Sequence, residues 1–275
     1  MDLLVQRPDQ ADQHLPPGAR IIDVYDELDS ALLILGAPGS GKTTLLLELA
    51  RELLYRAEQG KGHPIPVIFP LSTWVEQRLP LTDWLRDELS KQYDVPRKIG
   101  EAWVEDDQIL PLLDGLDEVK VEHRAACVEA INTFRQGHGL LPLVISSRRA
   151  DYEAIGKRLR LQGAIAIQPL THEQVDFYLK QGGTSLEAVR QALHDDSSLW
   201  ELLDTPLMLT IVALAYTGLP ATPLQWHGTL EERRHHIFTD YAKQMFQRRS
   251  AMARYSAEQT VLWLRWLASR WYNIV

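Results

Sequence analysis

The sequence predicts an α/β protein in which helices cover both faces of a five-stranded, mainly parallel sheet, followed by an all-helical region. Two observations support this prediction. Short apolar runs alternate with helix-like segments as far as residue 167, as is typical of parallel sheets. From Thr171 onward only helical patterns remain, so we expect a domain boundary near Leu170 in this chain of 275 residues.

Residues 1–27 precede the predicted sheet. They contain Pro8, Pro16, Pro17 and Gly18 among glutamine and aspartate residues, a composition that is typical of loops. A more apolar segment, residues 21–25, follows. We therefore expect a loose leader that ends in a short segment docked on the core.

The first predicted strand, residues 31–35, is followed directly by a glycine-rich loop and then by the helix-like run 45–50. The loop sequence GAPGSGKTT matches the pattern G-x-x-x-x-G-K-[ST], in which backbone N–H groups and the start of a helix bind phosphates. The predicted nucleotide-binding residues are Gly36, Ala37, Pro38, Gly39, Ser40, Gly41, Lys42, Thr43 and Thr44. We expect Lys42 to reach the β- and γ-phosphates and the Thr43 hydroxyl to help hold Mg²⁺. The alternative is a glycine-rich turn that only connects a strand to a helix.

Four more apolar runs predict the remaining strands of the sheet. They are residues 66–72, 109–113, 141–146 and 164–167. Helical periodicity predicts helices at residues 81–93 and 122–135 between them. Pro111 lies inside one of the predicted strands and removes a backbone donor from it, which weakens that assignment.

An acidic segment, DGLDE, follows the strand predicted at residues 109–113. A carboxylate at the carboxyl end of a buried strand faces the crevice where open α/β sheets bind ligands. We therefore expect Asp114 to hold the Mg²⁺ shell, and Glu118 or Asp117 to polarise an attacking water. The alternative is an acidic turn that caps the next helix.

Two arginines follow the strand predicted at residues 141–146. The carboxyl end of this strand should lie next to that of the first strand, so an arginine here could reach the γ-phosphate of a bound nucleotide. We expect Arg148 to have this role, with Arg149 as the second candidate. The alternative is that both side chains are simply solvated.

The composition limits the classes of partner. Lysine and arginine total 29 against 37 aspartate and glutamate, a net charge of −8, which argues against broad binding to nucleic acid or anionic lipid. The single cysteine, Cys127, cannot form an internal disulfide and favours a reducing, cytoplasmic location. The chain has no signal-like N-terminus and no apolar run of about 20 residues, so we expect membrane association only through segments outside it.

The helical region begins at Thr171, where the spacing of Thr171 and Gln174 predicts a capping box. Further helices are predicted at residues 186–194, 206–216, 230–248 and 257–271. Glycine and proline residues predict a turn at 218–220.

Five segments together resemble a NACHT-domain nucleotide-binding protein of the STAND class, prokaryotic type. They are LLILGAPGSGKTTLLLELA, PVIFPLSTW, LPLLDGLDEV, LVISSRRADY and LLDTPLMLTIVALAY, and the likeness extends from about residue 28 to residue 218. The resemblance implies a P-loop NTPase fold of the ASCE type. Its implied organisation is a leader at 1–27, a nucleotide-binding domain at 28–170, a helical domain at 171–222, and helices at 223–275 that could begin a winged-helix domain.

The resemblance also implies roles for individual residues. Asp114 would bind magnesium, Glu118 would be the catalytic base and Arg148 the arginine that senses the γ-phosphate. Pro206 matches the family proline that packs on adenine, although it could equally serve only to start a helix. His235 and His236 are candidates for the family histidine that contacts the nucleotide, and nothing in the sequence chooses between them.

The function that the resemblance implies is a slow, Mg²⁺-dependent ATPase that acts as a signalling switch, with bound ATP converted to ADP. Relatives of this kind self-associate when active, have sensor and effector segments, and serve in prokaryotic signalling or defence. Three alternatives stay open: a P-loop kinase of a small molecule, a non-hydrolysing scaffold held together by nucleotide, and a nucleic-acid-stimulated motor. The net charge and the lack of a basic, aromatic-rich groove in the sequence disfavour the motor.

Overall fold

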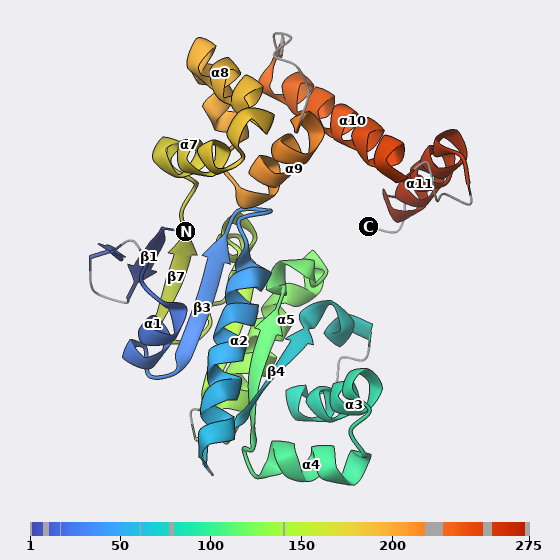
Figure 1. Cartoon of the computed structure of the whole chain (residues 1–275). Helices are drawn as coiled ribbons and strands as arrows, with labels where there is room; N and C mark the ends of the chain where they lie inside the picture. Colours follow the sequence, from blue (N-terminus) through green and yellow to red (C-terminus); the bar gives the residue numbers. More distant parts are fainter. Residues whose placement is uncertain are drawn as a thin grey trace. The chain divides into compact units, whose positions relative to one another are not determined.

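The computed structural model describes residues 2–7, 11–16, 18–60, 62–76, 80–139, 141–217, 228–249 and 255–272. The chain forms two compact units, Met1–Pro169 and Leu170–Val275 (Figure 1). The predicted turn at 218–220 and the expected boundary between residues 222 and 223 lie outside the described residues. None of the described helices is both long enough and apolar enough to cross a membrane.

The first unit contains a seven-stranded sheet in the order β2-β1-β7-β3-β6-β5-β4. Its strands are β1 (Leu3–Gln6), β2 (Gln13–His14), β3 (Ala31–Gly36), β4 (Ile65–Pro70), β5 (Ile109–Asp114), β6 (Leu143–Arg148) and β7 (Gly163–Ile167). The strands from β3 to β7 pair in parallel, while β1 pairs antiparallel with both β7 and β2. The carboxyl ends of the five parallel strands therefore share one edge of the sheet.

All five predicted strands are present, and the prediction of a mainly parallel sheet is confirmed. The predicted number of strands was incomplete, because part of the expected loose leader forms β1 and β2. Leu3 and Val5 of β1 are buried, and β1 pairs along β7 from Leu3↔Ile167 to Gln6↔Ala164. Pro111 does not interrupt β5, whose pairing with β6 is registered just beyond it at Leu112↔Val144 and Leu113↔Ile145.

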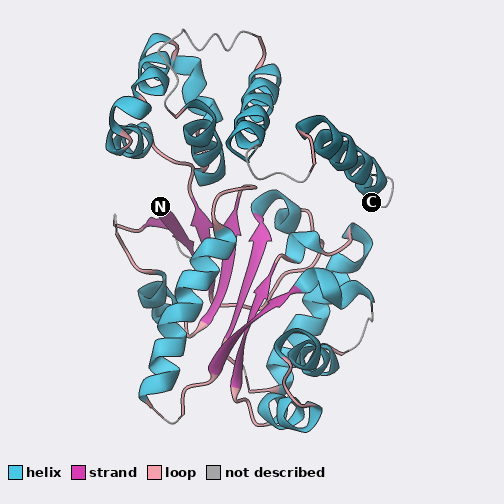
Figure 2. Cartoon of the chain, turned by 45° about the vertical axis from the view of Figure 1, so that its right-hand side comes forward, coloured by secondary structure: helices cyan, strands magenta, loops and turns pink. Residues whose placement is uncertain are grey.

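Helices cover both faces of this sheet (Figure 2). They are α1 (Ile21–Glu27), α2 (Lys42–Gln59), α3 (Leu81–Tyr93), α4 (Arg97–Glu105), α5 (Val121–Gly137) and the short α6 (Arg149–Glu153). Strand residues alternate between the two faces. Leu32 and Ile34 of β3 pack in the cluster that contains α1 and α2, whereas Leu33 and Leu35 pack in the cluster that contains α3 and α5.

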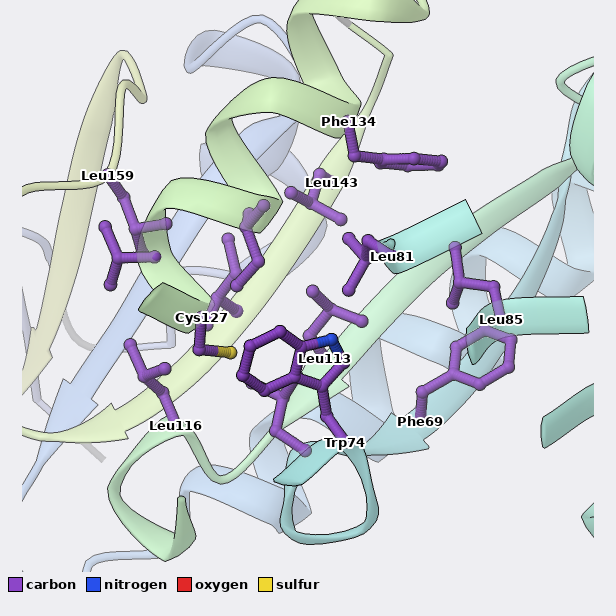
Figure 3. Packing of buried hydrophobic residues seen from close by; sticks show 14 of the residues in the cluster. Phe69, Trp74, Leu81, Leu85, Leu113, Leu116, Cys127, Phe134, Leu143 and Leu159 are labelled. Atoms are coloured by element: carbon purple, nitrogen blue, oxygen red, sulfur yellow. The ribbon is translucent and has the colours of Figure 1, made fainter. Parts of the chain in front are cut away.

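The second of these clusters is shown in Figure 3, where Trp74, Phe69 and Cys127 lie between the sheet and its helices. Trp74 follows β4 in a 3₁₀ segment, Leu71–Glu76, and Cys127 lies on α5. Both side chains are buried. This packing holds α5 against β5 and β6, the two strands whose carboxyl ends carry the acidic segment and the arginines.

The second unit is helical, as predicted. Its helices are α7 (His172–Gln181), α8 (Glu187–Asp195), α9 (Pro206–Tyr216), α10 (Leu230–Arg249) and α11 (Ala257–Tyr272). The capping box at the start of α7 is confirmed: the Gln174 backbone N–H donates to Thr171 Oγ1 at 3.3 Å, and the Thr171 N–H donates to Gln174 Oε1 at 3.1 Å. The core of this unit centres on α9, in which Val212 and Ala215 are fully buried.

Candidate functional site

The glycine-rich loop connects the end of β3 to the start of α2 (Figure 1). Gly39 and Gly41 have φ angles of 74° and 96°, a left-handed conformation that costs glycine little and other residues much more. Gly41 is the N-cap of α2, and no side chain among the described residues caps this helix. The first backbone N–H groups of α2 are therefore available to an anion, and the helix dipole favours negative charge there.

Gly36 and Ser40 approach each other closely inside the loop. A Cβ atom on Gly36 would lie only 2.3 Å from Ser40 Oγ, so the turn has no room for a side chain at this position. The Ser40 hydroxyl is buried and has no hydrogen-bond partner among the described residues. Buried polar groups are normally paired, so this hydroxyl is an exception inside the loop.

Lys42 is the first residue of α2. Its ammonium group donates to two carbonyl oxygens of the loop, Gly36 O at 3.2 Å and Ala37 O at 3.0 Å. Burial lowers the pKa of this ammonium, and the nearby Asp117 carboxylate opposes that shift. The lysine thus lies over the loop with its charge compensated by carbonyl dipoles and by Asp117.

The Thr43 hydroxyl and the Asp114 carboxylate are in direct contact. Thr43 Oγ1 donates to Asp114 Oδ2 at 2.9 Å, which joins the first turn of α2 to the end of β5. The other carboxylate oxygen, Oδ1, accepts a hydrogen bond from the hydroxyl of Ser146 on β6, and Ser146 Oγ accepts the Gly115 N–H at 2.9 Å. Asp114 is therefore fixed at the shared edge of the sheet by hydroxyls from α2 and β6.

These oxygen groups fit a magnesium ion. Mg²⁺ prefers oxygen ligands and is usually bound by one or two protein groups together with substrate phosphates and waters. Across the described part of the chain, no group of three or more His, Cys, Asp or Glu side chains could form a metal site by itself. Thr43 and Asp114 thus provide the partial ligand set that a nucleotide-bound magnesium requires.

Glu118 ends the short 3₁₀ segment Leu116–Glu118, and a left-handed Gly115 leads into this segment with φ 79°. A Cβ on Gly115 would lie 2.9 Å from Glu118 Cδ, so the glycine allows the glutamate to fold back over the turn. Glu118 is exposed as a whole residue, but partial desolvation of its carboxyl raises the pKa of that group, and the negative charges of Asp117 and Asp114 raise it further. A raised pKa makes this carboxylate a stronger base than an ordinary glutamate.

Asp117 and Arg148 form an ion pair. Asp117 Oδ1 accepts the backbone N–H of Arg148 at 2.9 Å, and Oδ2 lies 2.8 Å from Arg148 Nε. Arg148 pairs with Gly36 in the ladder between β3 and β6, so its backbone lies beside the first residue of the loop. The second candidate, Arg149, instead pairs with Glu153 on α6 at 2.9 Å, and its side chain is about half exposed, like that of Arg148.

Sequence reasoning missed two residues that hold this site together. Ser146 is fully buried in an apolar strand, and a small hydroxyl residue just before the two arginines was the available signal. Arg124, near the start of α5, donates to the backbone oxygens of Asp117 at 2.6 Å and Val119 at 2.9 Å, and pairs with Asp151 at 2.8 Å. No pattern in the sequence distinguishes Arg124 from other arginines on helices.

Pro206 belongs to the second unit. It is the first residue of α9, and the Thr205 hydroxyl before it accepts the Met208 N–H at 3.4 Å as a helix cap. This geometry explains the proline through helix initiation alone. His235 and His236 are both exposed on α10. The roles expected for Pro206 and for these histidines at a nucleotide stay predictions.

Comparisons with known proteins identify the family of the chain. The NACHT domain family model matches residues 21–182, more than half of the 275 residues. No curated protein matches the chain. The Aeropyrum pernix ORC1 protein in complex with DNA is similar in structure, with a TM-score of 0.47 and 13% identity over 87% of this chain and 70% of that chain. C. elegans PCH-2 is similar with a TM-score of 0.38 and 15% identity, over 82% of this chain and 64% of its own.

The family match covers all three motifs of the candidate site. The matched residues include the loop after β3, the acidic segment after β5 and the arginines after β6. The chain therefore belongs to the NACHT domain family, and its first unit is a nucleotide-binding P-loop domain.

Proposed function

We propose that this NACHT domain binds ATP with Mg²⁺ at the loop 36–44, hydrolyses it slowly to ADP, and acts as a nucleotide-controlled switch. The observation that carries the proposal is the contact of 2.9 Å between Thr43 Oγ1 and Asp114 Oδ2. These are the hydroxyl and the carboxylate that P-loop NTPases use to hold a nucleotide-bound magnesium. They come from α2 and β5, and the fold brings them together beside the phosphate-binding loop.

Thr43 and Asp114 would hold the magnesium, with Ser146 keeping the Asp114 carboxylate in its orientation. When bound, the ion would neutralise charge on the phosphates. The free N–H groups of α2 would bind phosphate oxygens. Lys42 would exchange its two carbonyl partners for the β- and γ-phosphates, which are stronger acceptors for an ammonium group.

Glu118 would orient and deprotonate the attacking water. Its carboxylate has no hydrogen bond to any described residue, so both oxygens are available to a water molecule. The upward direction of its pKa supports a role as proton acceptor, because a carboxylate with a raised pKa binds a proton more strongly.

The switch part of the proposal depends on the γ-phosphate. Lys42 and Arg148 come from different segments of the first unit, so losing the γ-phosphate would remove contacts that hold these segments in one arrangement. We propose that this change controls self-association and a signalling output, in the manner of prokaryotic STAND proteins. The support for that step is the family membership of the chain.

The test is to measure which nucleotide copurifies with the full chain and whether added Mg-ATP is hydrolysed. The wild type is compared with Lys42→Ala, Glu118→Gln and the surface control Lys157→Ala, whose charge pairs with Glu129 on the outside of the first unit. We expect Lys42→Ala to lose nucleotide binding, Glu118→Gln to bind ATP without hydrolysing it, and Lys157→Ala to behave as wild type.

Other outcomes would separate this proposal from its rivals. Nucleotide that copurifies and never turns over in the wild type would indicate a scaffold. A small-molecule kinase would keep phosphoryl transfer to its acceptor in Glu118→Gln, because it does not need an activated water. Unchanged nucleotide binding in Lys42→Ala would refute the site itself.

A further inference from the structure

One carboxylate of the acidic segment, that of Asp117, is already paired with an arginine of the protein. Both oxygens of Asp117 are engaged by Arg148, one with the backbone N–H at 2.9 Å and the other with Nε at 2.8 Å. The Asp117 side chain is only 6% exposed, so it has little surface left for a water molecule. A carboxylate held in this way is a fixed acceptor for an arginine.

The pairing with Asp117 restricts where the Arg148 side chain can lie. The hydrogen bond from the Arg148 backbone N–H fixes where β6 ends, and the ion pair of 2.8 Å keeps the Nε end of the guanidinium beside the Asp117 carboxylate. The two terminal nitrogens, Nη1 and Nη2, have no hydrogen bond to the described residues, and the Arg148 side chain is 48% exposed. Arg148 is also the ladder partner of Gly36. Asp117 therefore pairs with one end of the guanidinium and leaves its other donors unpaired among the described residues, on a residue whose backbone lies beside the first residue of the loop.

Glu118, the next residue, differs in each of these respects. It is exposed and its carboxylate makes no hydrogen bond to the described residues. The two neighbouring acids therefore differ in what they can bind. Glu118 is free to contact water, whereas Asp117 is already paired with an arginine.

Arg124 braces the backbone that carries Asp117. Its side chain is 12% exposed, and its guanidinium donates to the backbone oxygens of Asp117 and Val119 and to the Asp151 carboxylate on α6. The acidic segment and the start of α6 are therefore linked twice, once through Arg148 and once through Arg124. These contacts hold in place the backbone from which the Asp117 side chain extends.

We infer that Asp117 is a positioning residue that aims Arg148 at the γ-phosphate, so that the Asp117–Arg148 pair lets the site distinguish nucleoside triphosphate from diphosphate. This inference rests on the proposed function, because it assigns Asp117 a role in the same site. It replaces the expectation that Asp117 could polarise the attacking water. Discrimination follows because only a triphosphate reaches the free Nη donors, and those donors are aimed only while Asp117 holds Nε.

The experiment measures the dissociation constants of Mg-ADP and of a non-hydrolysable Mg-ATP analogue for the full chain. The variants are Asp117→Asn, Arg148→Ala, the double variant, Glu118→Gln, and Arg149→Ala as the control. Asp117→Asn keeps the shape of the side chain and an acceptor for the Arg148 N–H, but turns an amide N–H₂ towards Nε. Arg149 is a matched control, because its charge is equal and its partner is Glu153 on the surface.

We expect Asp117→Asn and Arg148→Ala each to lower the preference for the triphosphate analogue about tenfold, the range for a hydrogen bond to a charged group, with ADP affinity unchanged. The double variant should be no worse than Arg148→Ala alone, because the aspartate acts through the arginine. Glu118→Gln and Arg149→Ala should keep the wild-type preference. If Asp117 only stabilised the fold, Asp117→Asn would instead weaken the binding of both nucleotides to the same extent.

The inference is overturned if Asp117→Asn keeps the wild-type preference, or if its effect adds to that of Arg148→Ala. If Asp117→Asn does not fold, Arg148→Lys decides, because a lysine keeps the charge but has no planar guanidinium whose Nε can pair with Asp117 while two separate terminal nitrogens point away from it. A wild-type preference in Arg148→Lys would then overturn the inference. Failure of the proposed function looks different: the wild type itself would bind neither nucleotide, or Lys42→Ala would bind both.

Discussion

At the residue scale, the loop 36–44 depends on the fit between Gly36 and Ser40. A side chain on Gly36 would meet Ser40 Oγ at 2.3 Å, whereas the next nearest atoms, Ser40 Cβ and Ile167 Cβ, lie at 3.3 and 3.4 Å. The main conflict is thus with the hydroxyl, and the contact with Ser40 Cβ is tight but much less severe. We predict that Gly36→Ala lowers the free energy of unfolding by about 1–2 kcal/mol, the usual cost of overpacking, as measured by urea denaturation without nucleotide.

The same geometry predicts that a second substitution, Ser40→Ala, restores the stability lost in Gly36→Ala. Ser40→Ala removes the clashing oxygen and a buried hydroxyl that has no partner among the described residues, so alone it should be neutral or slightly stabilising. Added to Gly36→Ala, it should restore most of the lost stability. Equal destabilisation by Gly36→Ala with and without Ser40→Ala would mean that the backbone, not the hydroxyl, limits this position.

Cys127 gives a prediction about chemical reactivity. It is fully buried on α5, and burial raises the pKa of its thiol to about 12. Because the thiolate is the reactive form, we expect almost no reaction with a thiol reagent at pH 8 in the native protein and rapid reaction of one thiol in denaturant. Rapid labelling of the native protein would show that α5 opens away from the sheet.

Part of the site could be predicted from the sequence because motif order fixes it. Lys42 and Thr43 follow a strand, and Asp114 ends another, so parallel pairing alone brings them to one edge. The Asp117–Arg148 pair could not be predicted, because it depends on side-chain conformations across two strands. Nor could Ser146, whose role appears only when its hydroxyl is seen on Asp114.

At the element scale, the five parallel strands could be predicted because each is a bracketed apolar run. β1 could not, because its four residues, LLVQ, are too few for a period to be recognised. Antiparallel pairing with β7 nevertheless buries Leu3, Leu4 and Val5. Tertiary contact thus decides the structure of this segment where local sequence does not.

The contribution of the capping box at the start of α7 to stability can be tested by mutation. Thr171 and Gln174 satisfy each other's backbone N–H groups. We predict that Thr171→Ala lowers the free energy of unfolding by about 1 kcal/mol, the typical value for a lost helix cap, as measured by thermal or urea denaturation. Thr210→Ala is the matched control: its hydroxyl only bonds the Pro206 carbonyl within α9, and the change should stay within about 0.5 kcal/mol. Equal losses in the two variants would contradict the cap.

At the scale of the whole molecule, the chain has separate hydrophobic cores. The clusters on the two faces of the sheet consist of residues from the first unit, and the cluster around α9 consists of residues from the second. Each unit therefore has its own driving force for folding, since burial of apolar surface is the main stabilising contribution. A ligand that binds one unit should stabilise that unit first.

This organisation predicts two unfolding transitions. Leu46 on α2 and Leu202 in the second unit are both fully buried, so Leu46→Ala and Leu202→Ala should each cost about 2–5 kcal/mol. Calorimetry should show that each variant lowers a different transition, and the losses should add in the double variant because the sites share no core. Mg-ADP should raise the transition that Leu46→Ala lowers, since the phosphate-binding loop leads into α2. A single transition lowered by both variants would instead show that the two cores unfold as one cooperative unit, and nucleotide would then stabilise the whole chain.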